Sequence, residues 1–259
     1  MTRPEKSRVR SAFERAANSY DAAASVQQRI CQELLARLPA SVEAPQTLLD
    51  AGCGTGFALN GLKARFPSAT PLALDFSRAM LARLDPRDQR VQADLEHLPL
   101  ASQCIDLYWS SLAVQWCDLR AVLCEARRVL SENGLLALAT LGPATFGELR
   151  HAFAGVDSHR HTIAFHSAAA IGTICSEAGL TAVDLRIEQE TAHYPDFRAL
   201  LKAVKAVGAN QLGDGRRTSL LGKTAFQQAE SAIETLRTAD GLPLTYDVIY
   251  LYARPSHQP

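Results

Sequence analysis

The chain has 259 residues, 47% of them hydrophobic, which is enough to form the core of one large or two small domains. Its 27 basic and 27 acidic residues give a formal net charge of zero, so the composition gives no support to a nucleic-acid-binding surface. No apolar run approaches the roughly 20 residues that span a bilayer, and the polar, basic N-terminus is not expected to be a secretory signal. The six cysteines form no C-x-x-C pair, which favours reduced thiols and a cytoplasmic location.

The first half of the chain predicts helices followed by an alternation of strands and helices. Apolar residues at helical spacing predict two helices over 7–38. Strands are then predicted over 47–50, 72–75, near Val91, 105–110 and 135–140, with a turn at Asn133–Gly134 leading into the last of these and a helix over about 119–130 before it. This alternation predicts a parallel sheet with helices on both faces.

The second half is less regular. The predicted elements are an insertion over 143–166, a helix over 167–178, a strand over 181–187, a helix over 196–207, a Gly- and Arg-rich loop over 208–222, a helix over 224–236 and a last strand over 245–252. We therefore expect an α/β fold in which residues 1–40 form an N-terminal helical cover. Residues 41–259 would form the main domain, with insertions at about 143–166 and 195–240.

The most informative segment is the turn after the first strand, residues 48–56, with the sequence LLDAGCGTG. An acid ends an apolar run, and three glycines follow at alternate positions, which is typical of a sharp strand-to-helix turn that lets the backbone approach a ligand. Two more acids end the next strands, Asp75 and then Asp94. Strand carboxyl ends meet at the ligand-binding edge of an open α/β sheet, so these acids are expected to lie together.

Three such acids favour S-adenosylmethionine over a dinucleotide. The dinucleotide fingerprint is G-x-G-x-x-G, whereas here G-x-G-x-G follows an acid that would repel a pyrophosphate. S-adenosylmethionine has no phosphate and carries an ammonium and a sulfonium. Asp50 is expected to face the ammonium, Asp75 to accept the ribose hydroxyls and Asp94 to accept the adenine amine, although each alone could be a turn or N-cap residue. The predicted cofactor-binding residues are Asp50, Gly52, Gly54, Gly56, Asp75, Asp94 and Leu95.

These features resemble the class I S-adenosylmethionine-dependent methyltransferases, which implies a Rossmann-like, doubly wound seven-stranded sheet with an antiparallel last strand. A narrower resemblance is to the malonyl-acyl-carrier-protein O-methyltransferases of biotin synthesis. It is carried by residues 13–21 (FERAANSYD), 110–117 (SSLAVQWC), 202–210 (KAVKAVGAN) with 215–216 (GR), and 243–246 (PLTY). That family commonly has an arginine in a His-x-Asn-Arg-Phe-like run, where this sequence has HTIAF with Ala164 at the arginine position.

The resemblance implies methyl transfer to the free carboxylate of a malonyl thioester on acyl carrier protein, the start of pimelate synthesis. A carboxylate is ionised near neutral pH and needs no general base, so alignment and desolvation should suffice. No metal is expected, because the histidines at 159, 161 and 166 have no acid or cysteine among them at ligand spacing.

Acceptor and partner residues are less defined. Arg216 is the predicted partner of the malonyl carboxylate, because a guanidinium matches two carboxylate oxygens, although it could be a solvated loop residue. Tyr20 and Gln115 are further candidates for positioning the acceptor, with a core aromatic as the alternative for Tyr20. Acyl carrier proteins are typically acidic, so a basic docking face is expected; a solvated helix face is the alternative. Its candidate residues are Lys202, Lys205, Arg216, Arg217 and Lys223.

Two other functions remain compatible with the cofactor motif. The first is a methyltransferase for a small hydroxylated or quinone-like metabolite. The second is a non-catalytic subunit that binds S-adenosylmethionine. Dependence of activity on the carrier protein would separate the first from the malonyl reaction, and release of S-adenosylhomocysteine would exclude the second.

Overall fold

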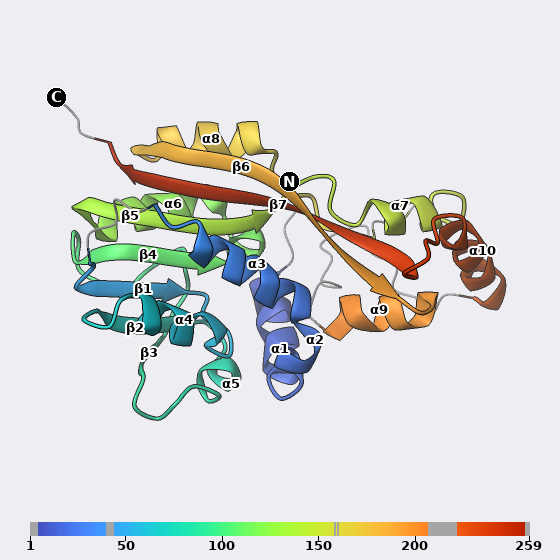
Figure 1. Ribbon diagram of the computed structural model, residues 1–259, viewed down its shortest axis with the longest axis horizontal. Coiled ribbons are helices and arrows are strands. Elements are labelled where there is room, and N and C mark those ends of the chain that lie inside the picture. Colours follow the sequence, from blue (N-terminus) through green and yellow to red (C-terminus); the bar gives the residue numbers. More distant parts are fainter. Residues whose placement is uncertain (1–4, 40–43, 158, 160, 207–221, 257–259) are drawn as a thin grey trace.

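The computed structural model describes residues 5–39, 44–157, 159, 161–206 and 222–256. They form a seven-stranded sheet in the order β3-β2-β1-β4-β5-β7-β6 (Figure 1). The strands are β1 (Thr47–Ala51), β2 (Thr70–Asp75), β3 (Gln89–Gln92), β4 (Ile105–Ser111), β5 (Leu130–Leu141), β6 (Leu180–Tyr194) and β7 (Leu242–Pro255). β1 to β5 pair in parallel, and β7 is antiparallel to both β5 and β6. The predicted doubly wound sheet with an antiparallel last strand is confirmed.

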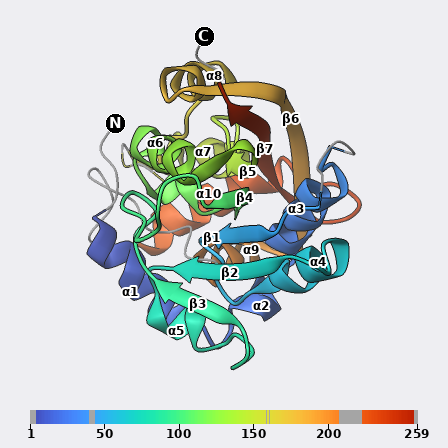
Figure 2. The same ribbon diagram turned by 90° about the vertical axis from the view of Figure 1, so that its left-hand side faces the viewer.

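The helices lie before, between and after these strands. They are α1 (Lys6–Ala16), α2 (Tyr20–Ala23), α3 (Ser25–Ala36), α4 (Phe57–Arg65), α5 (Arg78–Leu81), α6 (Leu119–Val129), α7 (Gly147–Phe153), α8 (Ala168–Glu177), α9 (Phe197–Ala206) and α10 (Lys223–Glu234), with a short 3-10 helix η1 at Val114–Trp116. Among these helices, none is long and apolar enough to cross a membrane. Figure 2 shows the twist of the sheet from β3 to β6.

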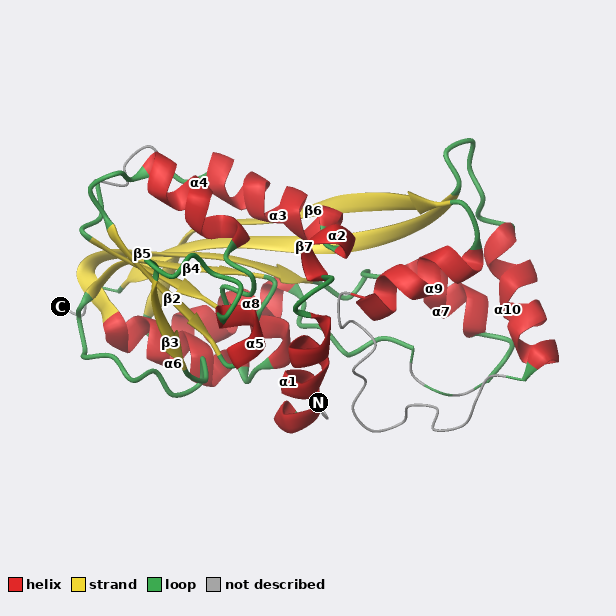
Figure 3. Cartoon of the chain, turned by 90° about the horizontal axis from the view of Figure 1, so that it is seen from below, coloured by secondary structure: helices red, strands yellow, loops and turns green. Residues whose placement is uncertain are grey.

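The central strands β1, β4, β5 and β7 are buried on both faces of the sheet. Successive residues of a strand point to opposite sides. Leu48 and Trp109 therefore pack in a core with α3 and α4, whereas Leu49 and Tyr108 pack in a second core with α6 and α8. Figure 3 shows α3 and α4 on one side of the sheet and α5, α6 and α8 on the other. Strands covered on both faces consist of nearly continuous apolar runs, which is why their positions could be predicted closely.

β6 and β7 are longer than predicted and project beyond the sheet. Their pairing runs from Leu180 opposite Pro255 to Tyr194 opposite Leu242, but β5 pairs only with the part of β7 from Val248 to Ala253. The projecting ends form a two-stranded ribbon, and α7, α9 and α10 gather around it (Figure 1). The extra length comes from pairing between segments far apart in the sequence, which local periodicity does not reveal.

Two local predictions were wrong in detail. The N-terminal region forms three helices rather than two, because a turn at residues 17–19 separates α1 from the single turn of α2. The predicted insertion over 143–166 contains the helix α7, and its status as an insertion stays a prediction. Asn133–Gly134 lies within β5 rather than before it. Ile105 pairs with Leu130 and Leu107 pairs with Leu135, so β5 has more residues than β4 between these two pairs. The extra residues form an irregularity in the strand pairing.

Candidate functional site

A cavity lies at the carboxyl ends of β1, β2 and β4. It occupies about 1000 Å³, including the part open to solvent, a size within the range of small-molecule sites. Its walls come from the glycine-rich turn, from the ends of those strands and from α1 and α3, and we call it the cofactor cavity. The predicted residues Asp50, Gly52, Gly54, Asp75, Asp94 and Leu95 all line it.

The three glycines of the turn have different roles. All have a positive φ, 80° at Gly52, 54° at Gly54 and 82° at Gly56, a region that side chains disfavour. A Cβ atom on Gly52 would lie 2.3 Å from the Cβ of Ala113, and one on Gly56 would lie 2.2 Å from Leu84 Cδ2. A Cβ atom on Gly54 would meet nothing within 4 Å. Gly52 and Gly56 thus allow close packing around the turn, whereas Gly54 leaves space on the side of the cavity.

Asp75 holds the turn in place through its carboxylate. The amide of Gly54 donates to Oδ2 at 3.0 Å, and the amide of Ser77 donates to Oδ1 at 2.8 Å. Burial raises the pKa of Asp75 to about 6, although these backbone hydrogen bonds act in the opposite direction. A carboxylate accepts more than one hydrogen bond at each oxygen, so Asp75 can still accept the ribose hydroxyls.

Asp50 has a buried oxygen with no hydrogen-bond partner among the described residues. The residue is only 2% exposed, and its Oδ2 is the unpartnered atom. Burial, followed by the nearby charge of Asp75, raises the pKa of Asp50 to about 8. An unpaired buried carboxylate costs free energy, and a cationic group of a ligand would remove that cost. The cavity therefore fits S-adenosylmethionine, whose ammonium suits Asp50.

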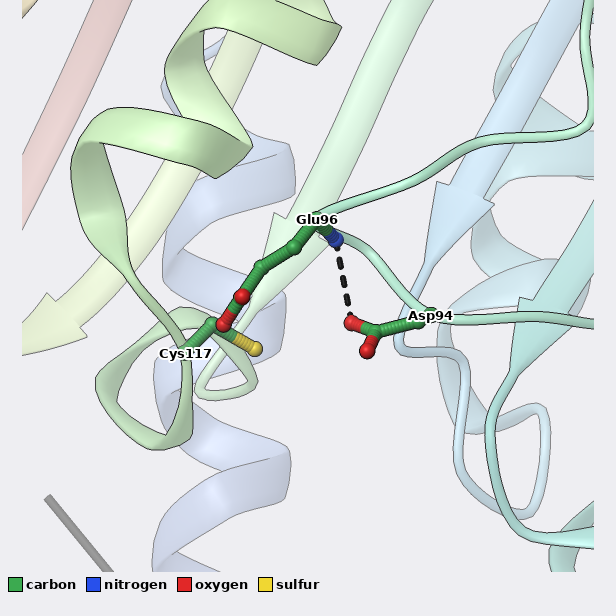
Figure 4. Close-up of side chains that lie close together, drawn as sticks. All are labelled: Asp94, Glu96 and Cys117. Atoms are coloured by element: carbon green, nitrogen blue, oxygen red, sulfur yellow. Dashed lines mark hydrogen bonds between the residues drawn. The ribbon is translucent and has the colours of Figure 1, made fainter.

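Asp94 has a partner that the sequence did not indicate. Its Oδ1 accepts a hydrogen bond from the amide of Glu96 at 3.0 Å, which Figure 4 shows beside Cys117. From α1, Lys6 places its Nζ 2.5 Å from Asp94 Oδ2 and 2.8 Å from Glu96 Oε2. Burial alone would raise the pKa of Asp94, but the Lys6 ammonium and the Glu96 amide outweigh it, so the pKa lies below its ordinary value.

The same place contains one group of potential metal ligands. Among the described residues, ligand atoms of Asp94, Glu96 and Cys117 lie within 4.8 Å of one another. The Lys6 ammonium already pairs with both carboxylates. This arrangement is therefore an ion-pair cluster of protein groups, and the absence of a catalytic metal stays a prediction.

A second cavity adjoins the first, and we call it the acceptor cavity. It occupies about 500 Å³ including its solvent-open part. Its lining residues are Phe13, Tyr20, Gln27, Leu112, Gln115, Trp116, Leu141, Phe146, Thr162, Ile163, Phe165 and Tyr246. The predicted acceptor residues Tyr20 and Gln115 are thus brought together, and Tyr20 also lines the cofactor cavity. Burial, with the charges of Asp75 and Asp21, raises the pKa of Tyr20, so its hydroxyl stays protonated and can donate.

The backbone of the acceptor cavity adopts an unusual conformation at two places. Leu112 and Phe146 have φ values of 53° and 59°, and they are two of the three non-glycine residues with positive φ in the described chain. Such conformations cost free energy and cluster at functional sites. Gln115 stabilises the first of them, because its Nε2 donates to the carbonyl oxygen of Leu112 at 2.7 Å. This supports a functional role for the acceptor cavity.

The HTIAF run forms part of the same cavity. The His161 ring stacks on Phe153 with centroids 3.7 Å apart, and its Nε2 lies 2.9 Å from Asp157 Oδ1. These contacts hold the following residues, of which 162, 163 and 165 line the acceptor cavity. Ala164, where the family commonly has arginine, is exposed and does not line it.

The predicted basic face is described only in part. Lys202 and Lys205 on α9 and Lys223 on α10 are exposed, and the two helices pack together. Arg216 and Arg217 lie outside the described residues. The predicted roles of these two arginines therefore remain predictions.

Sequence similarity to known proteins identifies the family of this chain. A family model described as a methyltransferase domain matches residues 49–138. The chain is 63% identical over 253 residues to the malonyl-[acyl-carrier protein] O-methyltransferase of Dechloromonas aromatica (strain RCB), which covers 98% of this chain and 96% of that protein. The chain belongs to the malonyl-acyl-carrier-protein O-methyltransferase family. The family resemblance predicted from the sequence is confirmed.

Two further similarities extend this result. A biotin biosynthesis bifunctional protein of Teredinibacter turnerae (strain ATCC 39867 / T7901) is 34% identical over 266 residues, which cover 96% of this chain and 47% of that protein. A geranyl diphosphate methyltransferase solved in complex with S-adenosylmethionine has a TM-score of 0.53 at 18% identity, over 88% of this chain and 85% of that one. At this identity, the solved structure supports the fold.

Proposed function

We propose that this chain transfers the methyl group of S-adenosylmethionine to the free carboxylate of a malonyl thioester carried by acyl carrier protein. The product is the malonyl methyl ester that would start pimelate synthesis for biotin. The observation that carries the proposal is the 63% identity, along nearly the whole chain, to a protein of that named activity. Two adjoining cavities with shared walls, one suited to the methyl donor, support it from the structure.

S-adenosylmethionine, when bound, supplies an activated methyl group on a cationic sulfur. Asp50 would pair with its ammonium, Asp75 would accept from its ribose, and Asp94 with Leu95 would hold its adenine. The acceptor carboxylate is already ionised, so no residue of the chain needs to remove a proton. The chain's contribution is alignment and exclusion of water.

The aromatic wall between the cavities serves that second task. The Phe13 ring lies 6.2 Å from that of Tyr20, 6.3 Å from that of Phe76 and 6.0 Å from that of Trp116, measured between centroids. Phe13 is on α1, so the N-terminal helices supply part of this wall. We propose that residues 1–40 act as a cover over the site, beside a main domain formed by residues 41–259.

The acceptor would reach the site from its carrier protein. Tyr20 and Gln115 would position the malonyl group within the acceptor cavity, and Arg216 remains the predicted charged contact for its carboxylate. The exposed lysines of α9 and α10 would contact the acidic carrier protein, together with Arg217.

The test compares acceptors at equal concentration with the same preparation of enzyme. Malonyl-acyl-carrier-protein, malonyl-coenzyme A and a small hydroxylated metabolite are each incubated with S-adenosylmethionine, and S-adenosylhomocysteine release is measured. Release with the carrier-protein substrate, together with a malonyl methyl ester identified by mass spectrometry, supports the proposal. Release only with the small metabolite, or cofactor binding without any release, contradicts it.

A further inference from the structure

Gln27 lies where the two cavities meet. It is a residue of α3 and borders both the cofactor cavity and the acceptor cavity. Four other residues share this position, namely Phe13, Tyr20, Leu112 and Trp116. A methyl group that passes from donor to acceptor has to cross this shared wall. Groups that line the wall are therefore within reach of the reacting atoms.

The acceptor cavity is mostly apolar, and its described part carries no charged side chain. None of its described lining residues is Lys, Arg, His, Asp or Glu. Its hydrogen-bonding side chains are hydroxyls, carboxamides and an indole, contributed by Tyr20, Gln27, Gln115, Trp116, Thr162 and Tyr246. A carboxylate that enters this cavity would be oriented by neutral donors.

Neutral donors suit this reaction, because methyl transfer from a sulfonium to a carboxylate removes both charges. The negative charge on the acceptor oxygen decreases on the way to the transition state. A full positive charge beside the attacking oxygen itself would stabilise the ground state more than the transition state and would slow the step, so the predicted contact of Arg216 is expected at the other carboxylate oxygen. A neutral hydrogen bond orients the oxygen at a smaller cost.

The carboxamide of Gln27 lies beside a tyrosine at one end and is unpartnered at the other. Its side chain lies close enough to the Tyr246 hydroxyl, and Tyr246 close enough to Tyr194, for each contact to affect the pKa of the tyrosines. Its Oε1 is fully buried and has no hydrogen-bond partner among the described residues. A buried polar atom without a partner is uncommon in native proteins and points to a missing ligand.

The donor and acceptor roles of Gln27, Tyr246 and Tyr194 toward one another can reverse. The terminal torsion of glutamine is broad and nearly two-fold, so the carboxamide can turn by about 180°. Hydroxyl groups both donate and accept, so Tyr246 can then donate to Gln27 while Tyr194 donates to Tyr246. After this turn, the amide nitrogen of Gln27 takes the place of the unpartnered oxygen and can donate to an anion.

We propose that Gln27 donates a hydrogen bond to the acceptor carboxylate and directs one of its oxygens toward the cofactor cavity. The inference rests on the proposed function and adds a substrate-contacting residue to it. The carboxylate oxygen forms the new O–C bond while the S–C bond breaks and leaves its electron pair on sulfur. No proton is gained or lost, and Gln27 keeps both amide protons.

The first test compares Gln27→Leu with Gln28→Leu. Gln28 is the next residue of α3, lines neither cavity and donates to the carbonyl oxygen of Asp21 at 3.3 Å. Loss of one hydrogen bond to a charged group should lower kcat/KM for malonyl-acyl-carrier-protein about 10- to 100-fold in Gln27→Leu. The cofactor Kd should stay close to that of the wild type, and Gln28→Leu should match the wild type in both measurements.

A second variant, Gln27→Glu, separates substrate contact from a structural role. It keeps the side-chain shape but replaces the donor with a carboxylate, which repels the acceptor when ionised and donates when protonated. Its activity relative to the wild type should therefore increase as the pH falls from 8 to 6. The surrounding titratable groups are Cys31, Asp50, Asp75 and the hydroxyls of Tyr20, Tyr194 and Tyr246. The wild type has the same surrounding groups. The ratio of Gln27→Glu activity to wild-type activity, measured at saturating cofactor, therefore reports only the titration of residue 27.

The outcomes separate this inference from the function on which it rests. If the wild type fails to methylate malonyl-acyl-carrier-protein, the proposed function is wrong and the role of Gln27 fails with it. Two results with an active wild type would overturn only the inference about Gln27. One is a kcat/KM of Gln27→Leu equal to that of Gln28→Leu. The other is an activity of Gln27→Glu, relative to the wild type, that does not change with pH.

Discussion

Lys6 and Asp94 are 88 positions apart in the sequence, yet the ammonium Nζ of Lys6 lies 2.5 Å from the carboxylate Oδ2 of Asp94 at the wall of the cofactor cavity. A second contact holds the same helix, because Glu14 accepts hydrogen bonds from the amides of Arg78 and Ala79 at the start of α5, at 2.8 and 3.1 Å. Helix α1 is thereby attached at two points, to the start of α5 after β2 and to the loop after β3. The expected adenine-binding acid is also an attachment point of α1, the first helix of the proposed N-terminal cover.

Lys6→Met should loosen this cover. The ion pair is partly exposed to solvent, so its loss should cost less than about 1 kcal/mol of folding stability. We expect cofactor association and dissociation both to become faster, by up to about fivefold, with a smaller change in Kd. Stopped-flow fluorescence measures both rates, and Lys6→Arg is the control that keeps the positive charge. Rates unchanged in Lys6→Met would show that α1 does not limit access to the cavity.

Asp75→Ala should weaken cofactor binding strongly. The change removes an acceptor for the ribose hydroxyls and also frees the amides of Gly54 and Ser77, which it holds in the turn. Two lost hydrogen bonds to a charged group predict at least about a 100-fold increase in Kd. Calorimetric titration measures this, with Asp85→Ala as a control at an exposed acid that pairs with Arg87. Retained affinity would show that the ribose does not bind at Asp75.

Cofactor binding should depend on pH through Asp50. Without a cofactor, its pKa is raised to about 8, so it is largely protonated at neutral pH, whereas the cofactor ammonium requires the ionised form. Affinity should therefore rise from pH 6 to 8 and then level off, with proton release on binding at pH 7. Calorimetry in buffers of different ionisation enthalpy detects that release. Asp50→Asn should bind more weakly and show much less proton release; an equal release in this variant would contradict the assignment.

The same carboxyl affects folding stability. The folded state retains the Asp50 proton up to about pH 8, while the unfolded state releases it near the reference value of 3.8. Between these values the folded state binds more protons, so stability should fall as pH rises. Asp75, with its pKa raised to about 6, acts in the same direction over a narrower range. The melting temperature of cofactor-free protein should thus decrease from pH 5 to 8, less steeply in Asp50→Asn; an equal slope in both proteins would contradict this.

Charge reversal should test the basic docking face. Lys202→Glu combined with Arg217→Glu is expected to raise the apparent KM for malonyl-acyl-carrier-protein, more at low than at high salt, because salt screens exposed charges. Arg87→Glu is the matched control, since Arg87 is exposed and pairs locally with Asp85. Kinetics of the double variant that match this control at low salt would assign docking to another surface.

The sequence predicted the elements whose signals are local. The turn over residues 50–56 carries its own pattern, because an acid and three glycines are needed within a few positions of one strand end. The central strands could be located because burial on both faces produces continuous apolar runs. The placement of Asp50 and Asp75 around one cavity followed from the rule that parallel strands share a carboxyl edge.

The rest depends on contacts between distant segments. Nothing near Lys6 in the sequence indicates that it pairs with Asp94, and the position of Gln27 depends on the rotation of α3 against the sheet. The length of β6 and β7 is set by their mutual pairing. Burial alternates over residues 188–194, but the half-buried positions include Glu188 and Glu190, so hydropathy does not reveal the strand. Such features are decided by packing, which single-sequence periodicity does not contain.

The central claim is methyl transfer to a free malonyl carboxylate, and labelled S-adenosylmethionine tests it most directly. The methyl label is followed into malonyl-acyl-carrier-protein and into acetyl-acyl-carrier-protein, which lacks the free carboxylate. The account predicts label in the malonyl form alone, in a product that mild base hydrolyses as an ester. Label in both forms, or in neither while the cofactor is still bound, would contradict it.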